Sequence, residues 1–268
     1  MRMSFSLRHW TIVRRMVQFV VIGLIASPLT GLTFFRGTLA AGDLFGLPLA
    51  DPLAALQVVL ASWVVVPTFI ASALGVTIFY FLLGGRTFCS WVCPVYLLTE
   101  LADKLRARLG SGENIIPLAT KKWVLLGTVV VTALSGLPLF EILSPIGMTG
   151  RAIAFGGWLA LACLVGLLLV EVTLGRRLWC RSFCPLGGFY SLVGSGSPLR
   201  VRFHRDRCTD CGDCTRVCPV AEVLVPPLEH GDPQVRAGDC TRCALCIDIC
   251  PTNALTIGIG YSGKGGSP

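Results

Sequence analysis

Two cysteine runs near the C-terminus place the tightest constraint on this chain. They read Cys208-x2-Cys211-x2-Cys214-x3-Cys218-Pro219 and Cys240-x2-Cys243-x2-Cys246-x3-Cys250-Pro251. Three cysteines at two-residue intervals followed by Cys-Pro are typical of chains that bind two [4Fe–4S] clusters. Zinc sites and a disulfide network are the alternatives, but zinc sites use pairs of ligands around a longer gap. The runs therefore predict an iron–sulfur protein.

The fourth cysteine of each run is expected to reach the cluster held by the other run. This assigns one cluster to Cys208, Cys211, Cys214 and Cys250, and the other to Cys240, Cys243, Cys246 and Cys218. Residues 195–260 are accordingly predicted to form an α+β domain of the bacterial two-[4Fe–4S] ferredoxin class, followed by a flexible tail, 261–268. Free thiols in this number indicate a reducing compartment.

Composition predicts a membrane protein. The chain is 53% hydrophobic and 14% charged, with a mean hydropathy of +0.71, whereas soluble domains are about 25% charged. The net charge of +8 comes from basic residues that flank apolar runs, so no nucleic-acid partner is expected. The three histidines lie outside the apolar runs and no Cys-x-x-Cys-His is present, so no haem is expected.

Four apolar stretches are long enough to cross a bilayer. They are residues 16–35, 64–83, 123–143 and 151–174. They predict a membrane α-helical domain over 16–194, preceded by a basic cytoplasmic segment, 1–15, and including a polar loop over 36–52.

The positions of the basic residues predict the orientation of these helices. Of the 23 Lys and Arg residues, all except Arg36 and Arg151 fall on one side of the four predicted spans. Because Lys and Arg are enriched on the cytoplasmic side, both termini and the ferredoxin domain are expected there. The prediction is a multi-pass protein of the bacterial inner membrane.

A second set of cysteines follows the second and fourth spans. These are Cys89-x3-Cys93-Pro94 and Cys180-x3-Cys184-Pro185, each preceded by Gly-Arg, which suggests an internal duplication. The spacing i, i+4 would place each pair on one helical face. If the pairs meet, they could hold a further cluster or metal ion, or form a reversible dithiol. The alternative is packing, which we also expect for the lone Cys163.

With these motifs, the chain resembles the NapH family of ferredoxin-type membrane subunits and the similar MauN proteins. The resemblance rests on the cysteine motifs together with three further segments, Val13–Phe19, Leu49–Leu53 and Ser144–Arg151. It implies a quinol dehydrogenase subunit that passes electrons from the quinol pool to a periplasmic redox system of the nitrate reductase or methylamine utilisation type. It also implies an iron–sulfur partner subunit.

Quinol oxidation requires a base near the site, because two protons leave with two electrons. Glu141 and Arg151 flank a short outer loop and are the candidates for such a site. The alternative is an ion pair or ordinary interface residues. No catalytic residue is assigned.

Two other functions compete with electron transfer. An assembly or metal-handling factor would use the membrane-edge cysteines to mature another redox enzyme. A structural anchor would leave the eight correctly spaced cluster ligands unexplained.

Overall fold

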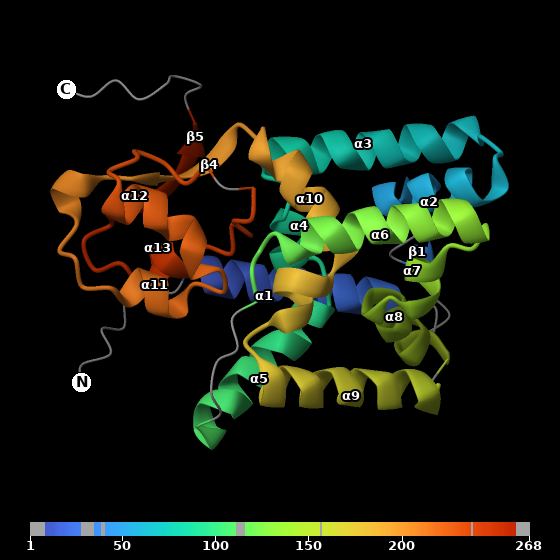
Figure 1. Ribbon diagram of the computed structural model, residues 1–268, viewed down its shortest axis with the longest axis horizontal. Helices are drawn as coiled ribbons and strands as arrows, with labels where there is room; N and C mark the ends of the chain where they lie inside the picture. The colour runs from blue at the N-terminus through green and yellow to red at the C-terminus, as the bar shows by residue number, and fades with distance from the viewer. Residues whose placement is uncertain are drawn as a thin grey trace. The chain divides into compact units, whose positions relative to one another are not determined.

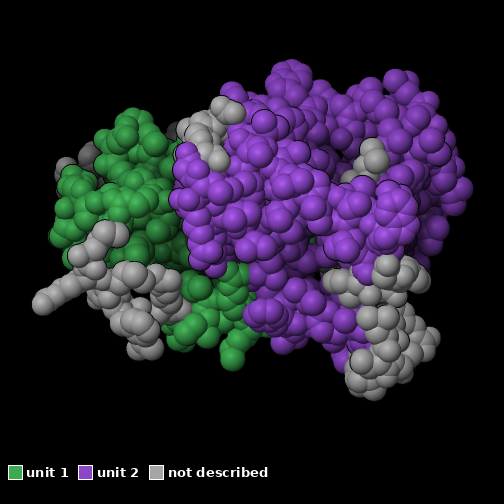
Figure 2. Space-filling view, turned by 90° about the horizontal axis from the view of Figure 1, so that it is seen from below, with its two compact units in different colours: residues 1–17, 80–91, 190–268 green, residues 18–79, 92–189 purple. Residues whose placement is uncertain are grey.

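The computed structural model describes residues 9–27, 35–38, 41–110, 116–155, 157–236 and 238–260. The N-terminal eight residues and the predicted tail, 261–268, lie outside these ranges. The chain forms two compact units (Figure 2). Unit 1 comprises Met1–Val17, Tyr80–Trp91 and Tyr190–Pro268, and unit 2 comprises Gln18–Phe79 and Val92–Phe189.

Unit 1 contains an α+β domain built on a two-stranded antiparallel sheet. Strand β4 (Leu199–Phe203) pairs with β5 (Leu255–Ile259), and Phe203 lies opposite Leu255. The two short helices α11 (Asp213–Val217) and α13 (Leu245–Ile249) follow the two cysteine-rich loops and pack against each other. A small apolar core lies between these elements, formed by Val201, Phe203, Val220, Val223, Leu224, Val235 and Leu255. Helix α12 (Val225–Glu229) lies in the chain between the two cysteine runs.

Segment 80–91 belongs to the same unit as the ferredoxin domain. It contains the short helix α4 (Thr87–Trp91). Phe88 stacks on Tyr190 with ring centroids 5.3 Å apart, and Tyr80 meets both rings edge-on. Gly85 permits this close packing, because a side chain there would collide with the carbonyl oxygen of Tyr190. Aromatic packing within unit 1 therefore fixes the position of the segment that precedes Cys89.

Unit 2 is a set of apolar helices. Its elements are most of α1 (His9–Ala26), α2 (Pro52–Ser62), α3 (Pro67–Leu83), α5 (Val95–Leu109), α6 (Thr120–Ser135), α7 (Leu139–Leu143), α8 (Pro145–Phe155), α9 (Trp158–Leu174) and the start of α10 (Pro185–Ser195) (Figure 1). Helix α9 packs against α5 and α8, and α2 packs against α6. Ala50, Ala55 and Ala73 form a small buried cluster with Phe69 against it.

The prediction of a polar loop over residues 36–52 is wrong. Three strands, β1 (Phe35–Gly37), β2 (Ala41–Leu44) and β3 (Leu47–Ala50), form an antiparallel sheet there. Phe45 and Gly46 join β2 to β3 with φ values of 54° and 85°. Two consecutive residues with positive φ make a type I′ turn, which suits a tight hairpin. Phe45 hides this turn from sequence analysis, since Asn or Gly is the usual residue at its position.

The described residues support fewer membrane crossings than the four predicted. One helix, α1, is long and apolar enough by length and composition, and a second crossing exists if Thr120–Ser135 and Leu139–Gly150, bent by 107°, count as one span. Helices α2, α3 and α9 are apolar but shorter. The four-span architecture therefore remains a proposal.

The helices of the structure have different limits from the predicted membrane spans. The first helix begins at His9 rather than Met16 and ends at Ala26. The predicted span 123–143 is interrupted because Gly136 caps α6 in the left-handed conformation (φ 67°) and Pro138 follows. The predicted span 151–174 is divided between α8 and α9, with Gly157 as the N-cap of α9.

Candidate iron–sulfur sites

The two cysteine-rich loops adopt the same backbone conformation. The residue before the second cysteine has a positive φ in both, 51° at Asp210 and 51° at Arg242. The residue after the second cysteine also has a positive φ, 74° at Gly212 and 59° at Ala244. These left-handed residues curl each loop around a centre, and α11 and α13 begin immediately after them. The loops are thus equivalent in structure as well as in spacing.

A pocket lies inside the first loop. Three of its lining cysteines, Cys208, Cys211 and Cys214, come from the first run and the fourth, Cys250, comes from the second. Phe203 and Leu228 supply an apolar wall. Cys211 is exposed and the other three are half-buried. Four thiols that converge on one pocket are the donor set that a [4Fe–4S] cluster requires, and the residues fit this group.

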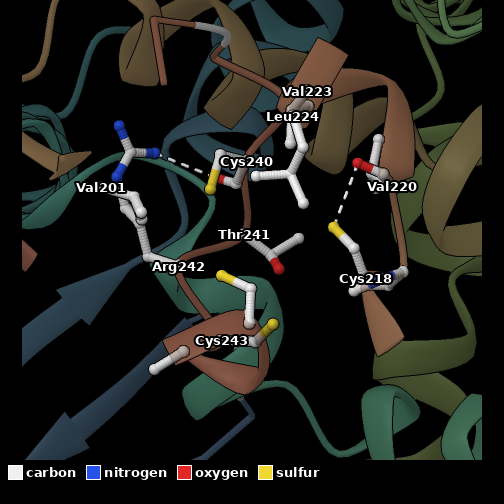
Figure 3. A pocket seen from close by; sticks show the side chains of 12 residues that line it. Val201, Cys218, Val220, Val223, Leu224, Cys240, Thr241, Arg242 and Cys243 are labelled. Carbon is white, nitrogen blue, oxygen red and sulfur yellow. Dashed lines mark hydrogen bonds between the residues drawn. The ribbon is translucent and has the colours of Figure 1, made fainter. Parts of the chain in front are cut away.

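A second pocket lies inside the second loop (Figure 3). It is lined by Cys240, Cys243 and Cys246 from that loop and by Cys218 from the first run. Figure 3 shows Cys240 and Cys218 on opposite sides of this pocket. Cys243 and Cys246 are buried. The exchange of fourth cysteines is thus present in the geometry of both pockets, and the eight ligands assigned from the sequence remain our proposal for the two clusters.

The protein environment opposes free thiolates at the second pocket. Burial raises the pKa of the Cys246 thiol well above its ordinary value, and the neighbouring thiols of Cys243 and Cys240 raise it further. Burial also raises the pKa of Cys240, although the positive charges of Arg242 and Arg86 oppose this effect. Because a cluster binds thiolates, its assembly there must release protons.

The pKa of Cys250 is shifted in the opposite direction, to a lower value. Burial raises its pKa, but hydrogen bonds from the backbone N–H groups of Thr252, Ala254 and Leu255 and from the Thr252 side chain together leave the pKa below the ordinary value. The N–H of Ala254 donates to the sulfur at 3.3 Å. Hydrogen bonds to cysteine sulfur are one determinant of cluster potential.

The membrane-edge cysteines do not lie on continuous helical faces, so that expectation is wrong. Cys89 is in α4, but the helix ends at Trp91 and Cys93 follows it. Cys180 is in a π-helical turn, Trp179–Phe183, and Cys184 is the residue that caps its end. Pro94 and Pro185 follow at once, which explains these early helix ends.

Each membrane-edge pair has one buried and one half-buried cysteine. Cys93 and Cys184 are buried, and Cys89 and Cys180 are half-buried. The N–H of Gly187, in the first turn of α10, donates to the sulfur of Cys184 at 3.3 Å. No group of three or more His, Cys, Asp or Glu among the described residues is arranged to hold one metal ion. Cys163 is exposed on α9, so the prediction that it packs in the protein interior is wrong.

Glu171 and Arg177 organise the turn that carries Cys180. The Glu171 carboxylate accepts hydrogen bonds from the backbone N–H groups of Leu178 at 2.8 Å and Trp179 at 2.7 Å. The Arg177 guanidinium donates to Asp103 at 2.5 Å and lies 4.5 Å from the centre of the Tyr96 ring. The sequence did not predict this role for either residue, although Arg177 lies three residues before Cys180 as Arg86 lies three residues before Cys89.

The candidate quinol residues Glu141 and Arg151 lie on α7 and α8, two helices that contact each other. Glu141 lies on α7 and is half-buried, while the side chain of Arg151, on α8, is outside the described side chains. Asp51 is buried and caps α2, and burial is the main reason that its pKa is raised to about 7. The negative charge of Glu141 raises this pKa further, so the two carboxyls interact. Asp51 is a residue that sequence analysis did not include in the site.

Comparisons with known proteins agree with this geometry. A family model described as a 4Fe-4S dicluster domain matches residues 200–251. A second model, described as a 4Fe-4S binding domain, matches twice, over residues 57–111 and 156–205. Each of the latter matches contains one membrane-edge cysteine pair, which supports the internal duplication. No solved structure matches the chain.

Curated relatives match over most of the chain. A Paracoccus denitrificans protein named methylamine utilization ferredoxin-type protein MauN is 38% identical over 240 residues, which are 88% of this chain and 85% of that protein. A Methylorubrum extorquens protein of the same name is 36% identical, covering 92% and 88%. An Escherichia coli protein named ferredoxin-type protein NapH is 33% identical, covering 95% and 91%.

The fold, the two thiol-lined pockets and the matching 4Fe-4S models define a ferredoxin-type iron–sulfur protein of electron transport. The sequence identity to curated relatives extends over nearly the whole chain and therefore narrows this class to one family. The chain belongs to the NapH/MauN family of ferredoxin-type proteins.

Proposed function

We propose that this protein is a membrane-bound quinol dehydrogenase subunit that passes electrons from the quinol pool to a periplasmic redox system. The observation that carries the proposal is the pair of pockets in unit 1, each lined by four cysteines with one exchanged between the runs. Two [4Fe–4S] clusters bound there would supply one-electron redox chemistry. The eight cysteines would hold these clusters, and the surrounding protein would set their electrostatic environment.

Membrane insertion through four helices is part of the proposal. Large apolar side chains are exposed along α3, α6 and α9, among them Phe79 at 55%, Leu134 at 83% and Trp158 at 79%. Apolar surface on this scale is uncommon on soluble monomers and is suited to lipid. Helices α3 and α9 have 17 residues each, which is the lower end of the range for a membrane span. The basic residues favour a cytoplasmic ferredoxin domain.

Asp51 and Glu141 are the proposed proton acceptors for quinol. One quinol that becomes quinone loses two protons and two electrons, and two clusters can take one electron each. A carboxyl group with a pKa of about 7, as at Asp51, is well matched to proton transfer at neutral pH. Arg151 stays in the proposal as a residue that flanks the same outer loop.

The membrane-edge cysteines are proposed to serve the path between quinol and the ferredoxin domain. The repeated match to a 4Fe-4S binding model, which covers each pair once, supports a ligand or redox role for Cys89, Cys93, Cys180 and Cys184. A ligand to a further cluster and a reversible dithiol are the two chemistries that we propose for these thiols.

The relatives indicate the type of redox system. Two of the relatives named above are called methylamine utilization proteins, and another is called NapH. We propose that this chain works with an iron–sulfur partner subunit and a periplasmic reductase or dehydrogenase of the nitrate or methylamine type.

A second candidate function is an assembly or metal-handling factor. It is favoured by the half-buried Cys89 and Cys180, which are accessible enough to exchange a metal or a disulfide. Replacing both by Ser separates the two functions. The dehydrogenase proposal expects reduction of the clusters by quinol to stop while the iron content of the ferredoxin domain is unchanged. Unchanged reduction kinetics would remove these cysteines from the electron path.

A further inference from the structure

Three buried arginines surround the second ligand loop. Arg14 lies on α1, Arg86 precedes α4, and Arg242 lies between Cys240 and Cys243 in the loop itself. Their exposed fractions are 0%, 1% and 4%. All three belong to unit 1, although Arg14 and Arg242 are separated by most of the sequence.

These arginines take part in a continuous set of hydrogen bonds to the loop. Five consecutive backbone carbonyl groups, from residue 239 to residue 243, each accept a bond from a side chain. The donors, in that order, are Arg86 at 2.8 Å, Arg242 at 2.9 Å, Ser90 at 2.7 Å, Trp91 at 3.1 Å and Arg14 at 3.2 Å. Three of the five come from the segment that carries Cys89. That segment therefore holds the second loop in place.

Two carboxylates lie at the same loop as the three arginines. Asp239 lies 3.9 Å from Arg86 and accepts a hydrogen bond from Ser191 at 2.6 Å. Asp248, on α13, accepts hydrogen bonds from Thr11 at 2.6 and 2.8 Å. Three guanidinium groups that are buried and bonded to the second loop place positive charge beside its pocket.

The first ligand loop has a different electrostatic environment. Its arginines are exposed, and each is paired with a nearby carboxylate. The pairs are Arg205–Asp210 at 2.7 Å, Arg216–Asp213 at 2.9 Å and Arg207–Asp206 at 3.7 Å. Exposed and paired charges have little effect on a nearby group because water screens them. The two loops share a backbone conformation but not an electrostatic potential.

We propose that Arg14, Arg86 and Arg242 raise the reduction potential of the cluster bound by Cys240, Cys243, Cys246 and Cys218 above that of the other cluster. Reduction adds one negative charge, which a buried positive charge stabilises strongly because little water screens it. Net charge and solvent exposure are known determinants of cluster potential. A raised potential would bring this cluster closer to the quinol pool, so the inference deepens the proposed function.

The test is a redox titration of the cluster-loaded full chain in lipid with chemical mediators, followed by EPR. It needs no quinol, so its result does not depend on the dehydrogenase proposal. Arg86→Gln should lower the higher of the two midpoint potentials and leave the lower one unchanged. We expect at least a tenfold fall in the ratio of reduced to oxidised cluster at a fixed potential, which is 59 mV for a one-electron centre.

Matched variants separate charge from structure. Arg86→Lys keeps the charge and should restore most of the shift. Arg205→Gln removes the same charge beside Cys208 from an exposed side chain and should move neither potential by a comparable amount. Asp239→Asn removes a negative charge beside Cys240 and should raise the higher potential. If Arg86→Gln lowers the iron content, the shift measured for Asp239→Asn tests the proposal in its place. Shifts that are absent, equal in both clusters or confined to the lower potential would overturn the proposal.

Discussion

Replacing Asp51 by Asn should change how the stability of this protein depends on pH. The Asp51 carboxylate caps α2 by accepting the N–H groups of Leu53 at 2.7 Å and Ala54 at 3.1 Å. Burial raises its pKa from 3.8 to about 7, the Ala54 N–H opposes this, and Glu141 adds to it. Asn retains the capping geometry but does not titrate.

The sign and size of the effect follow from linkage. Because the pKa is higher in the folded chain than in the unfolded chain, the folded chain holds a proton that the unfolded chain releases between pH 4 and 7. This contribution to stability is complete below about pH 4 and is lost as the pH rises through 7. Each pH unit in that window is worth about 1.4 kcal/mol. From pH 5.5 to pH 8 the wild-type free energy of unfolding should therefore fall by roughly 2 kcal/mol from this group alone.

The assay is thermal unfolding in lipid nanodiscs at pH 5.5 and pH 8, followed by tryptophan fluorescence. The Asp51→Asn variant should be more stable than the wild type at pH 8, and the difference should shrink at pH 5.5. Asp43→Asn, in the hairpin before α2, is the matched control and should behave as the wild type does. An Asp51→Asn variant with the wild-type pH dependence would refute the assigned burial effect.

Three further variants test the site. Cys211→Ser should remove one cluster signal and destabilise unit 1, because cluster binding is coupled to folding, and a fully loaded, equally stable variant would refute the ligand assignment. Gly212→Ala should destabilise the loaded domain by about 1 kcal/mol in thermal unfolding, since only the positive φ of 74° opposes the added methyl group. Ala244→Gly, at the equivalent position of the second loop, should have the opposite sign, and two changes of equal sign would contradict the conformational explanation.

The two sets of cysteine ligands could be predicted from the sequence because the shape of the cluster sets the spacing of its ligands. Eight cysteines in two runs predicted both sets, and the pockets bring together those same residues. Helix limits were less predictable. The end of α6 depends on the left-handed Gly136 and on Pro138, which interrupt an otherwise continuous apolar stretch.

The role of the arginines could not be predicted from local sequence. Arg14 and Arg86 were explained by membrane topology alone, yet both are buried and bonded to a loop more than 150 residues away. Contacts between such distant residues are set by tertiary packing, which no spacing rule describes. The Cys-x3-Cys-Pro pairs are a similar case, because Pro94 and Pro185 end the helices that the i, i+4 spacing had suggested.

The most direct test of the central claim is anaerobic addition of a quinol analogue to the purified protein in lipid, with EPR and an iron count. We expect about eight irons from two [4Fe–4S] clusters, or clearly more with a further centre at the membrane-edge cysteines. We also expect reduction of the cluster EPR signals by quinol. Fully assembled clusters that quinol does not reduce, with or without the iron–sulfur partner subunit, would contradict the quinol dehydrogenase function.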